Sequence, residues 1–108
     1  MIKDHKEVVK RIEKWATKRG LHRTDPAKQM LKMTEEVGEL AAAIARGNQS
    51  DIVDAIGDVQ VVLIVLCLQL GYDADTCLSM AYQQIAPRKG MIINGVFVKE
   101  EDLKKDDN

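Results

Sequence analysis

The segment DAIGDVQVVLIVLCLQL, residues 54–70, decides the fold of this 108-residue chain. From Val59 to Leu70 the segment is apolar nearly all the way round a helix, with two Gln as its polar residues. A surface helix of a small monomer needs a wide polar face, and a four-helix domain of this size has little core in which to bury such a helix. We therefore expect it to pack against the same helix of a second copy, in a homodimer or homotetramer. The alternative is that the chain's other three helices enclose it.

Helical periodicity extends outward from this segment in both directions. Val8, Ile12 and Trp15 recur at spacings of three and four residues, which predicts an amphipathic first helix. Asp25 followed by Pro26 is a favourable start for the second, because Asp caps free amides and Pro loses no needed donor at the first helical position. The predicted elements of a single domain over 1–108 are helices at about 4–19, 26–46, 51–70 and 74–86, and a C-terminal arm at 87–108.

Capping and turn residues set the remaining boundaries. Ser50 is expected to cap the third helix and Asp73 the fourth, which Pro87 ends. Beyond it, the sequence MIINGVFV places Asn94 and Gly95 between two short β-compatible runs, and this pair favours a type I′ hairpin turn. The final ten residues, KEEDLKKDDN, are expected to be a solvated tail. The predicted fold class is an all-α four-helix bundle with a short C-terminal hairpin or arm.

Composition gives no indication of nucleic acid or a membrane as a partner. Sixteen Lys and Arg against seventeen Asp and Glu leave a net charge of −1, so nothing indicates nucleic acid or an anionic membrane as a partner. The start, MIKDHKEVVKR, lacks the apolar core of a signal peptide, and the longest apolar run is too short to span a bilayer. We expect a cytoplasmic protein. Cys67 and Cys77 form no CxxC or Cys/His pattern, which predicts reduced core thiols.

The stretch KMTEEVGELAAAI crowds three carboxylates, Glu35, Glu36 and Glu39, into five positions of the second predicted helix. Like charges at this spacing repel one another. At about 100° per residue, Glu36 and Glu39 lie on one flank of an apolar seam together with Gln29 and Lys32, while Glu35 lies further round. The seam, which we expect to be core, consists of Met30, Met33, Val37, Leu40 and Ile44.

A second acidic pair opens the third helix. Asp54 and Asp58 lie one turn apart on one face, and they are expected to converge with Glu36 and Glu39 at the edge of the core. Facing carboxylates are destabilising when left alone, because desolvation and repulsion add. Oxygen-only ligands suit a hard cation, Mg²⁺ or Mn²⁺, rather than zinc, and open positions on such a cation would also bind phosphate. The alternative is that each carboxylate is an ordinary solvated residue.

The order EEVGEL, a short loop and then DAIGDVQVVL resembles the MazG-like nucleoside triphosphate pyrophosphohydrolases. These belong to the all-α NTP pyrophosphatase superfamily, which also contains dimeric dUTPases and phosphoribosyl-ATP pyrophosphohydrolases. The stretch PRKGMIINGVFVKEED is similar to small stand-alone phage and bacterial members, so the resemblance runs from about Trp15 to Asp102. It implies a helical bundle that assembles as a dimer or tetramer. It also implies Mg²⁺-dependent cleavage of an NTP or dNTP into the monophosphate and pyrophosphate.

The family pattern is EExxE followed, after a loop, by ExxD. The residues EEVGE match the first part, and Asp58 matches the final Asp. The Glu of ExxD falls on Ala55, with Asp54 immediately before it. Either Asp54 supplies the fourth ligand or that ligand is missing.

The resemblance implies a role for each of the matching residues. Glu35 is a candidate to accept a proton from the attacking water or to orient a ligand. The implied catalytic residues are Glu35, Glu36, Glu39 and Asp58, and the implied metal ligands are Glu36, Glu39, Asp54 and Asp58. Candidate substrate-binding residues are Gln29, Lys32, Arg88, Lys89 and Trp15, the last by stacking on a base. Ordinary surface cations and a core Trp are the alternatives.

A reading from a different class stays open. The chain has the features of a non-catalytic dimeric helical interaction or regulatory module if Ala55 marks a metal site that has been lost. Metal binding distinguishes the two readings. Within the enzyme class, no spacing rule in the sequence selects the base or the sugar.

Overall fold

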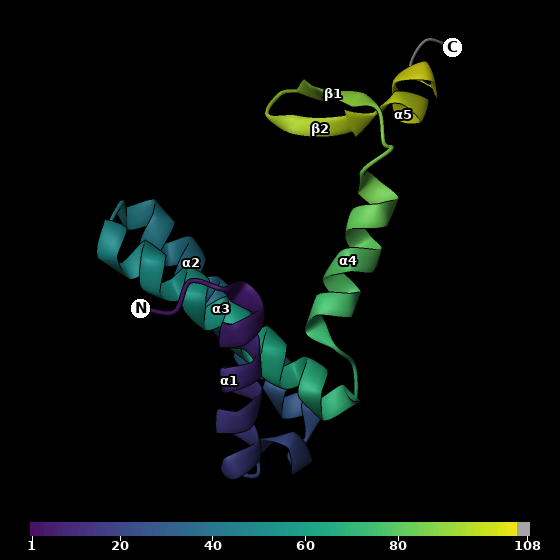
Figure 1. Cartoon of the computed structure of the whole chain (residues 1–108). Coiled ribbons are helices and arrows are strands. Elements are labelled where there is room, and N and C mark those ends of the chain that lie inside the picture. Colours follow the sequence, from purple (N-terminus) through teal and green to yellow (C-terminus); the bar gives the residue numbers. More distant parts are fainter. Residues whose placement is uncertain (106–108) are drawn as a thin grey trace. The chain divides into compact units, whose positions relative to one another are not determined.

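The computed structural model describes residues 1–105 and is mostly helical (Figure 1). Within these residues it contains five α-helices, one 3₁₀ turn and a two-stranded hairpin near the C-terminus. The prediction of an all-α fold with a C-terminal hairpin is confirmed. The chain divides into two compact units, Met1–Asp75 and Thr76–Asn108, and each is described by itself. The single domain expected over the whole chain stays a prediction.

Helix α1 (His5–Lys18) begins where the Asp4 side chain accepts two backbone N–H hydrogen bonds, at 3.0 and 3.4 Å. Its ends agree with the prediction to within one residue. Val9 and Ala16 are its buried residues. The helix contacts α3 (Gln49–Leu70). An apolar hollow on this side of the unit is lined by Ile2, Val8, Arg11, Ile12, Trp15 and Val61.

Helix α2 (Pro26–Arg46) has the predicted bounds. The Asp25 side chain accepts a hydrogen bond from the backbone N–H of Ala27 at 2.9 Å, and Pro26 occupies the first turn. The cap works as expected because an Asp oxygen satisfies an amide that has no partner within the helix.

Helix α3 begins earlier than predicted. Its cap is Asn48, whose side chain accepts a hydrogen bond from the backbone N–H of Asp51 at 3.2 Å; the prediction of Ser50 as the cap was wrong, since Ser50 lies inside the first turn. Only Gly47 and Asn48 separate α2 from α3, so the two helices form a tight antiparallel hairpin. No helix within residues 1–105 combines the length and the apolar character that crossing a membrane requires.

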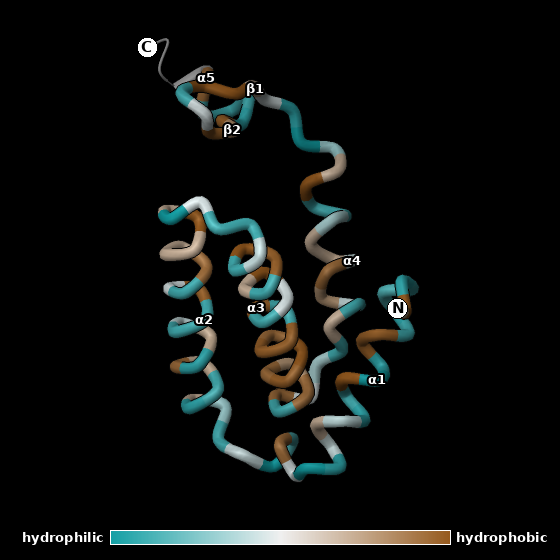
Figure 2. The backbone as a smooth tube through the Cα atoms, turned by 90° about the vertical axis from the view of Figure 1, so that its left-hand side faces the viewer, coloured by the Kyte–Doolittle hydropathy of each residue, from teal (hydrophilic) through white to brown (hydrophobic). Residues whose placement is uncertain are grey.

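The α2–α3 hairpin forms the main core of the first unit. The two helices run side by side, and the hydrophobic residues are densest in the second half of α3 (Figure 2). Ala43 and Ala55 are 1% and 6% exposed, and their small side chains allow the backbones to approach closely. Buried residues of the pair are Met33 and Ala43 on α2 and Ala55, Val62, Ile64 and Val65 on α3.

Polar side chains tie this core together at its edges. The side-chain amide of Gln29 donates a hydrogen bond from α2 to the backbone carbonyl of Val62 on α3, at 3.2 Å. Gln69, one of the two Gln in the apolar run, donates to the carbonyl of Leu21 at 3.0 Å and to the hydroxyl of Thr24 at 2.8 Å. These bonds attach the end of α3 to the 3₁₀ turn η1 (Leu21–Arg23), which explains a polar residue in that position.

The apolar seam expected to be core is only partly buried. Met33 is buried and Leu40 is half-buried, whereas Met30, Val37 and Ile44 are 51%, 48% and 59% exposed. The prediction was wrong for these three residues, because α2 turns its adjacent flank, containing Ala43, toward α3. On α3, a second exposed stripe repeats at the same seven-residue interval. We call the two stripes together the apolar face: Met30, Val37, Ile44, Ile56, Leu63 and Leu70.

Helical geometry puts both stripes on one side of the hairpin. Counted at 100° per residue in the direction of the chain, the stripe lies roughly 80–90° further round than Met33 and Ala43 on α2, and than Ala55 and Val62 on α3. Because the helices are antiparallel, the same rotation on both moves the stripes to the same side. The charged residues of both helices follow the opposite side: Lys28, Lys32, Glu35, Glu36, Glu39, Arg46, Asp51, Asp54 and Asp58.

The second unit contains most of α4 (Ala74–Ile85), then β1 (Gly90–Ile93), β2 (Val96–Lys99) and α5 (Glu100–Lys105). The strands pair antiparallel, with Ile93 opposite Val96 across Asn94 and Gly95. These two turn residues have φ values of 51° and 79°. Positive φ at both positions is the signature of the predicted type I′ turn.

Helix α5 corrects the expectation of a solvated tail after the hairpin. Glu100–Lys105 is helical, and the backbone N–H of Glu100 donates to the carbonyl of Lys89 at 2.8 Å, which joins the start of α5 to the residue before β1. Its first turn is acidic, and negative charge there is favourable to the helix dipole. The remaining tail residues of that prediction, 106–108, lie outside the described part of the chain.

Gly90 generates a stability prediction for the hairpin. A Cβ atom at this position would collide with the carbonyl oxygen of Val98 and lie 2.6 Å from Cζ of Phe97. We expect Gly90→Ala to destabilise the hairpin by about 1–3 kcal/mol, the usual cost of overpacking. Hydrogen exchange of the amides of β1 and β2 should accelerate. Gly38→Ala is the matched control, because a Cβ at that helical position meets nothing within 4 Å. Unchanged exchange in Gly90→Ala would contradict the packing seen at this strand.

Candidate functional site

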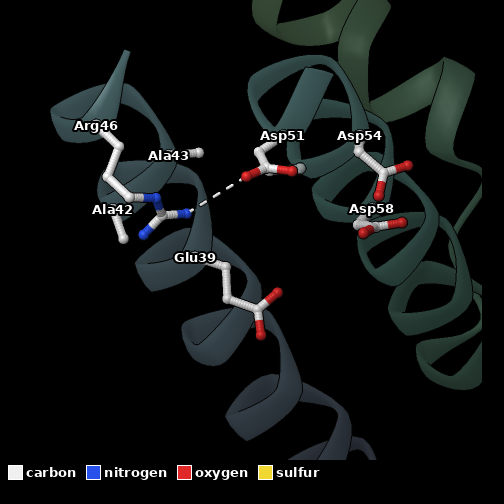
Figure 3. A pocket seen from close by; sticks show the side chains of 8 residues that line it. Glu39, Ala42, Ala43, Arg46, Asp51, Asp54 and Asp58 are labelled. Atoms are coloured by element: carbon white, nitrogen blue, oxygen red, sulfur yellow. Dashed lines mark ion pairs between the residues drawn. The ribbon is translucent and has the colours of Figure 1, made fainter. Parts of the chain in front are cut away.

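The charged side of the α2–α3 hairpin contains a hollow near the connection between the two helices (Figure 3). Side chains from both helices line it, and three of the carboxylates are ones that the sequence predicted to converge. We call it the acidic hollow: Glu39, Ala42, Ala43 and Arg46 of α2, and Asp51, Asp54, Ala55 and Asp58 of α3. Pairing of the two helices therefore brings the two acidic motifs together, as expected.

Glu36 lies close to two carboxylates of this hollow, Glu39 and Asp58. Its Oε2 atom is buried and has no hydrogen-bond partner. Desolvation raises the pKa of the Glu36 carboxyl above its ordinary value, and the negative charges of Glu39 and Asp58 raise it further. Lys32 lowers this pKa and so offsets part of the effect. The site thus concentrates negative charge around a carboxylate oxygen that lacks a protein donor.

The donor chemistry of this site fits a hard divalent cation. Glu36, Glu39, Asp54 and Asp58 offer carboxylate oxygens only, and the unpartnered Glu36 oxygen is the atom a cation would satisfy. As placed, no three acidic, His or Cys side chains within residues 1–105 are gathered closely enough to hold an ion. Mutual repulsion opposes such gathering when no positive charge is present. Binding a cation would require rotamer changes at exposed carboxylates, which cost little.

Ala55 stands where the family pattern has Glu, and Asp54 immediately precedes it; the two residues have different surroundings. Both line the hollow, and Ala55 is buried against α2 while Asp54 is exposed on the rim. Asp54 and Asp58 are one turn apart on this side of α3 (Figure 3). Asp54 therefore has access to the hollow, as a substitute ligand requires.

The other predicted residues of α2 differ in their relation to the hollow. Glu35 is exposed and does not line it, consistent with its position further round the helix. Lys32 is exposed and close enough to influence the Glu36 carboxyl. Gln29 uses its amide to bond the Val62 carbonyl, so this side chain has a structural role in the chain as it stands.

The remaining predicted substrate-binding residues are Trp15, Arg88 and Lys89. Trp15 is 45% exposed, and the Arg19 guanidinium lies 4.3 Å from the centre of its ring. One face of the indole is therefore already covered by a cation, as in a cation–π contact. Arg88 and Lys89 belong to the second unit, where they line a separate hollow with Gln84, Pro87, Lys99, Glu100 and Glu101.

Two charged residues of the acidic hollow, Arg46 and Asp51, were not predicted from the sequence. Their side chains approach across the hairpin connection, with a guanidinium nitrogen of Arg46 3.7 Å from an Asp51 carboxylate oxygen (Figure 3). One available signal was the seven-residue interval from Glu39 to Arg46, which puts both on one face of α2.

Fold and site together define a class: an all-α protein with clustered carboxylates between two antiparallel helices. Residues 4–83 match the model of the phosphoribosyl-ATP pyrophosphohydrolase family, so the chain belongs to that family. The matched range includes α1, α2, α3 and nearly all of α4. The match supports the broader expectation of an all-α pyrophosphohydrolase-like domain, and the MazG-like family expected from the sequence stays a prediction.

One relative comes from a bacteriophage. Over 72 residues the chain is 39% identical to an uncharacterized 18.2 kDa protein in the rep-hol intergenic region of Haemophilus phage HP1. The aligned part covers 66% of this chain and 44% of the phage protein, so the chain spans less than half the length of that relative. No solved structure matches the chain significantly.

The raised pKa of Glu36 generates a prediction about stability. The folded state binds more protons than the unfolded state just above the ordinary Glu pKa, so this group makes folding less favourable as pH rises through that window. Without divalent cations, Glu36→Gln should therefore unfold at a higher temperature than the wild type at about pH 7. The difference should shrink at about pH 4, where the carboxyl is largely protonated in both states.

Thermal unfolding followed by circular dichroism measures this difference. Glu35→Gln is the matched control, because Glu35 is exposed and outside the hollow; its unfolding temperature should stay near that of the wild type. A Glu36→Gln protein less stable than the wild type at about pH 7 would contradict the proposed repulsion.

Proposed function

We propose that the chain is a Mg²⁺-dependent nucleotide pyrophosphohydrolase that hydrolyses a nucleoside triphosphate, NTP or dNTP, to the monophosphate and pyrophosphate. The observation that carries the proposal is the desolvated carboxyl of Glu36, whose Oε2 atom is buried without a hydrogen-bond partner, beside Glu39 and Asp58 in a chain of a pyrophosphohydrolase family. A purely structural role does not account for these charges, since their arrangement costs stability.

In this proposal Glu36, Glu39, Asp54 and Asp58 hold Mg²⁺, with Mn²⁺ as a substitute. When bound, the cation neutralises phosphate charge and activates water for attack at phosphorus. Glu35, exposed one residue before Glu36, takes the proton of the attacking water or orients a ligand. Lys32 holds a phosphate oxygen from the same helix. Trp15, Gln29, Arg88 and Lys89 remain candidates for substrate binding.

The family is named for phosphoribosyl-ATP, whereas the proposed substrate is a nucleoside triphosphate, as for the MazG-like enzymes. The support for this substrate is the local sequence, since EEVGEL with DAIGDVQVVL and the stretch PRKGMIINGVFVKEED resemble the small MazG-like enzymes. A substrate panel must therefore contain both kinds of nucleotide.

Hydrolysis of NTPs, dNTPs and phosphoribosyl-ATP with Mg²⁺, analysed by phosphorus NMR, tests the proposal. Attack at the α-phosphorus of a triphosphate gives monophosphate and pyrophosphate, whereas attack at the γ-phosphorus gives diphosphate and orthophosphate. We expect pyrophosphate as the first product and no turnover when EDTA is present. Orthophosphate as the first product would refute the reaction, and cleavage of phosphoribosyl-ATP alone would refute the triphosphate preference.

Variants of the ligands test the site in the same assay. Glu39→Gln keeps the shape of the side chain and removes its charge, so Mg²⁺ affinity and activity should fall by at least about a hundred-fold. Asp54→Asn should behave likewise if Asp54 replaces the family's Glu. A fully active Asp54→Asn would show that the fourth ligand is assigned wrongly. Absence of Mg²⁺ and Mn²⁺ binding by the wild type in calorimetry would favour the non-catalytic module. That alternative rests on Ala55, which stands where the family pattern has Glu.

The proposal includes self-association through the apolar face. Its six residues are about half exposed or more, and the charged residues of both helices follow the opposite side. Large contiguous apolar patches on soluble proteins mark interaction sites. A two-helix face with seven-residue repeats is complementary to itself under a two-fold axis, which would form a four-helix bundle from two hairpins. Such a contact would leave the acidic hollow uncovered.

A charge on the apolar face should prevent this association. Val37 and Leu63 are 48% and 47% exposed, so Val37→Lys and Leu63→Lys keep their charges in water in the isolated chain and bury them only in the assembly. We expect light scattering to give a multiple of 12.1 kDa for the wild type and 12.1 kDa for the double variant, with unchanged helical circular dichroism. Lys28→Glu, on the charged side, is the control. A wild-type mass of 12.1 kDa at every concentration would refute self-association.

A further inference from the structure

The charges that line the acidic hollow are unevenly distributed along it. Carboxylates of Glu39, Asp54 and Asp58 line the part nearer the middle of the hairpin, and Arg46 lies at the end nearer the connection (Figure 3). Among the described residues that line this hollow, Arg46 is the one cation. The carboxylates suit a metal ion, whereas a guanidinium suits an anion.

A structural role explains little of this placement. Arg46 is the last residue of α2, where positive charge favours the helix dipole, and its partner Asp51 lies in the first turn of α3. The ion pair is 3.7 Å long and its side chains are 60% and 52% exposed. Exposed pairs of this kind contribute about 0–1 kcal/mol, so a stronger anion can displace Asp51 easily.

The spacing between Arg46 and the carboxylates suits an extended anion. Arg46 follows Glu39 by seven residues, two helical turns or roughly 10 Å along one face of α2. A triphosphate whose oxygens bind a cation near Glu39 extends beyond that cation, and its remaining phosphates need another positive partner. A guanidinium binds phosphate through two parallel hydrogen bonds, which a surface Lys cannot match.

We propose that Arg46 binds the pyrophosphate moiety of the substrate, which is the leaving group of the reaction proposed above. On binding, the guanidinium releases the Asp51 carboxylate and pairs with the pyrophosphate moiety instead. This inference rests on the proposed function and adds to it a residue that recognises the phosphates furthest from the reacting phosphorus. Asp51 is then a competitor that occupies the guanidinium when no substrate is bound.

The inference predicts opposite effects for the two partners of one ion pair. Arg46→Gln should weaken binding of Mg²⁺-pyrophosphate to the Mg²⁺-loaded protein by about ten- to a hundred-fold, the usual value of a charge-assisted contact. Asp51→Asn removes the competitor, so affinity should stay the same or rise. If the pair served only to hold the hairpin together, both variants would have the same small effect. Arg46→Lys should be intermediate, because it keeps the charge and loses the paired geometry.

Isothermal titration with preformed Mg²⁺-pyrophosphate measures these affinities, and titration with Mg²⁺ alone should give nearly equal values for the wild type and Arg46→Gln. Arg11→Gln is the matched control, because Arg11 also forms an exposed ion pair, at 3.1 Å with Glu7, and lies outside the hollow.

Equal pyrophosphate affinity in the wild type and Arg46→Gln would overturn the role of Arg46 while leaving the proposed function standing. A wild type that binds Mg²⁺-pyrophosphate and yet hydrolyses no nucleotide would overturn the proposed function and retain the anion site. A wild type that binds no Mg²⁺-pyrophosphate would overturn the Arg46 inference.

Discussion

The close antiparallel pairing of α2 with α3 is the constraint on which the rest of the first unit depends. A connection of two residues, Gly47 and Asn48, forces the chain to reverse, and the small side chains of Ala43 and Ala55 let the helices approach. Because Ala43 of α2 faces α3, the rotation of α2 about its own axis is fixed. This rotation determines on which side of the hairpin each remaining residue of α2 lies. The carboxylates go to one side, and the two apolar stripes go to the other.

This separation gives the hairpin two surfaces with different physical needs. The apolar face lacks charge and its six residues are exposed, so covering it would lower the free energy of the chain, as the proposed self-association does. The acidic hollow concentrates negative charge next to the desolvated Glu36, and the cation of the proposed function would offset that charge. Both surfaces belong to one helix pair. The same helix pairing therefore positions both the apolar face and the residues of the proposed activity.

Local features of the fold were largely predictable. The start of α2 at Pro26 and the turn at Asn94 and Gly95 follow from short-range chemistry: a side chain that caps an amide, and residues that tolerate positive φ. The cap of α3 was missed because Asn48 and Ser50 are both good capping residues two positions apart, and the choice depends on where α2 ends. Helix α5 was missed because its sequence is strongly charged, and charge alone does not distinguish a short helix next to a hairpin from a solvated tail.

The sequence by itself determined that the first four helices form and that EEVGEL and DAIGD lie on neighbouring helices, because only a short connection separates them. Only the tertiary structure decided how α2 is rotated about α3. That rotation exposed Met30, Val37 and Ile44, engaged Gln29 with the Val62 carbonyl, and brought Arg46 opposite Asp51 at the hollow. The physical reason is that spacing within one helix orders its residues around an axis, whereas the direction that faces a neighbour depends on how the side chains of both helices pack.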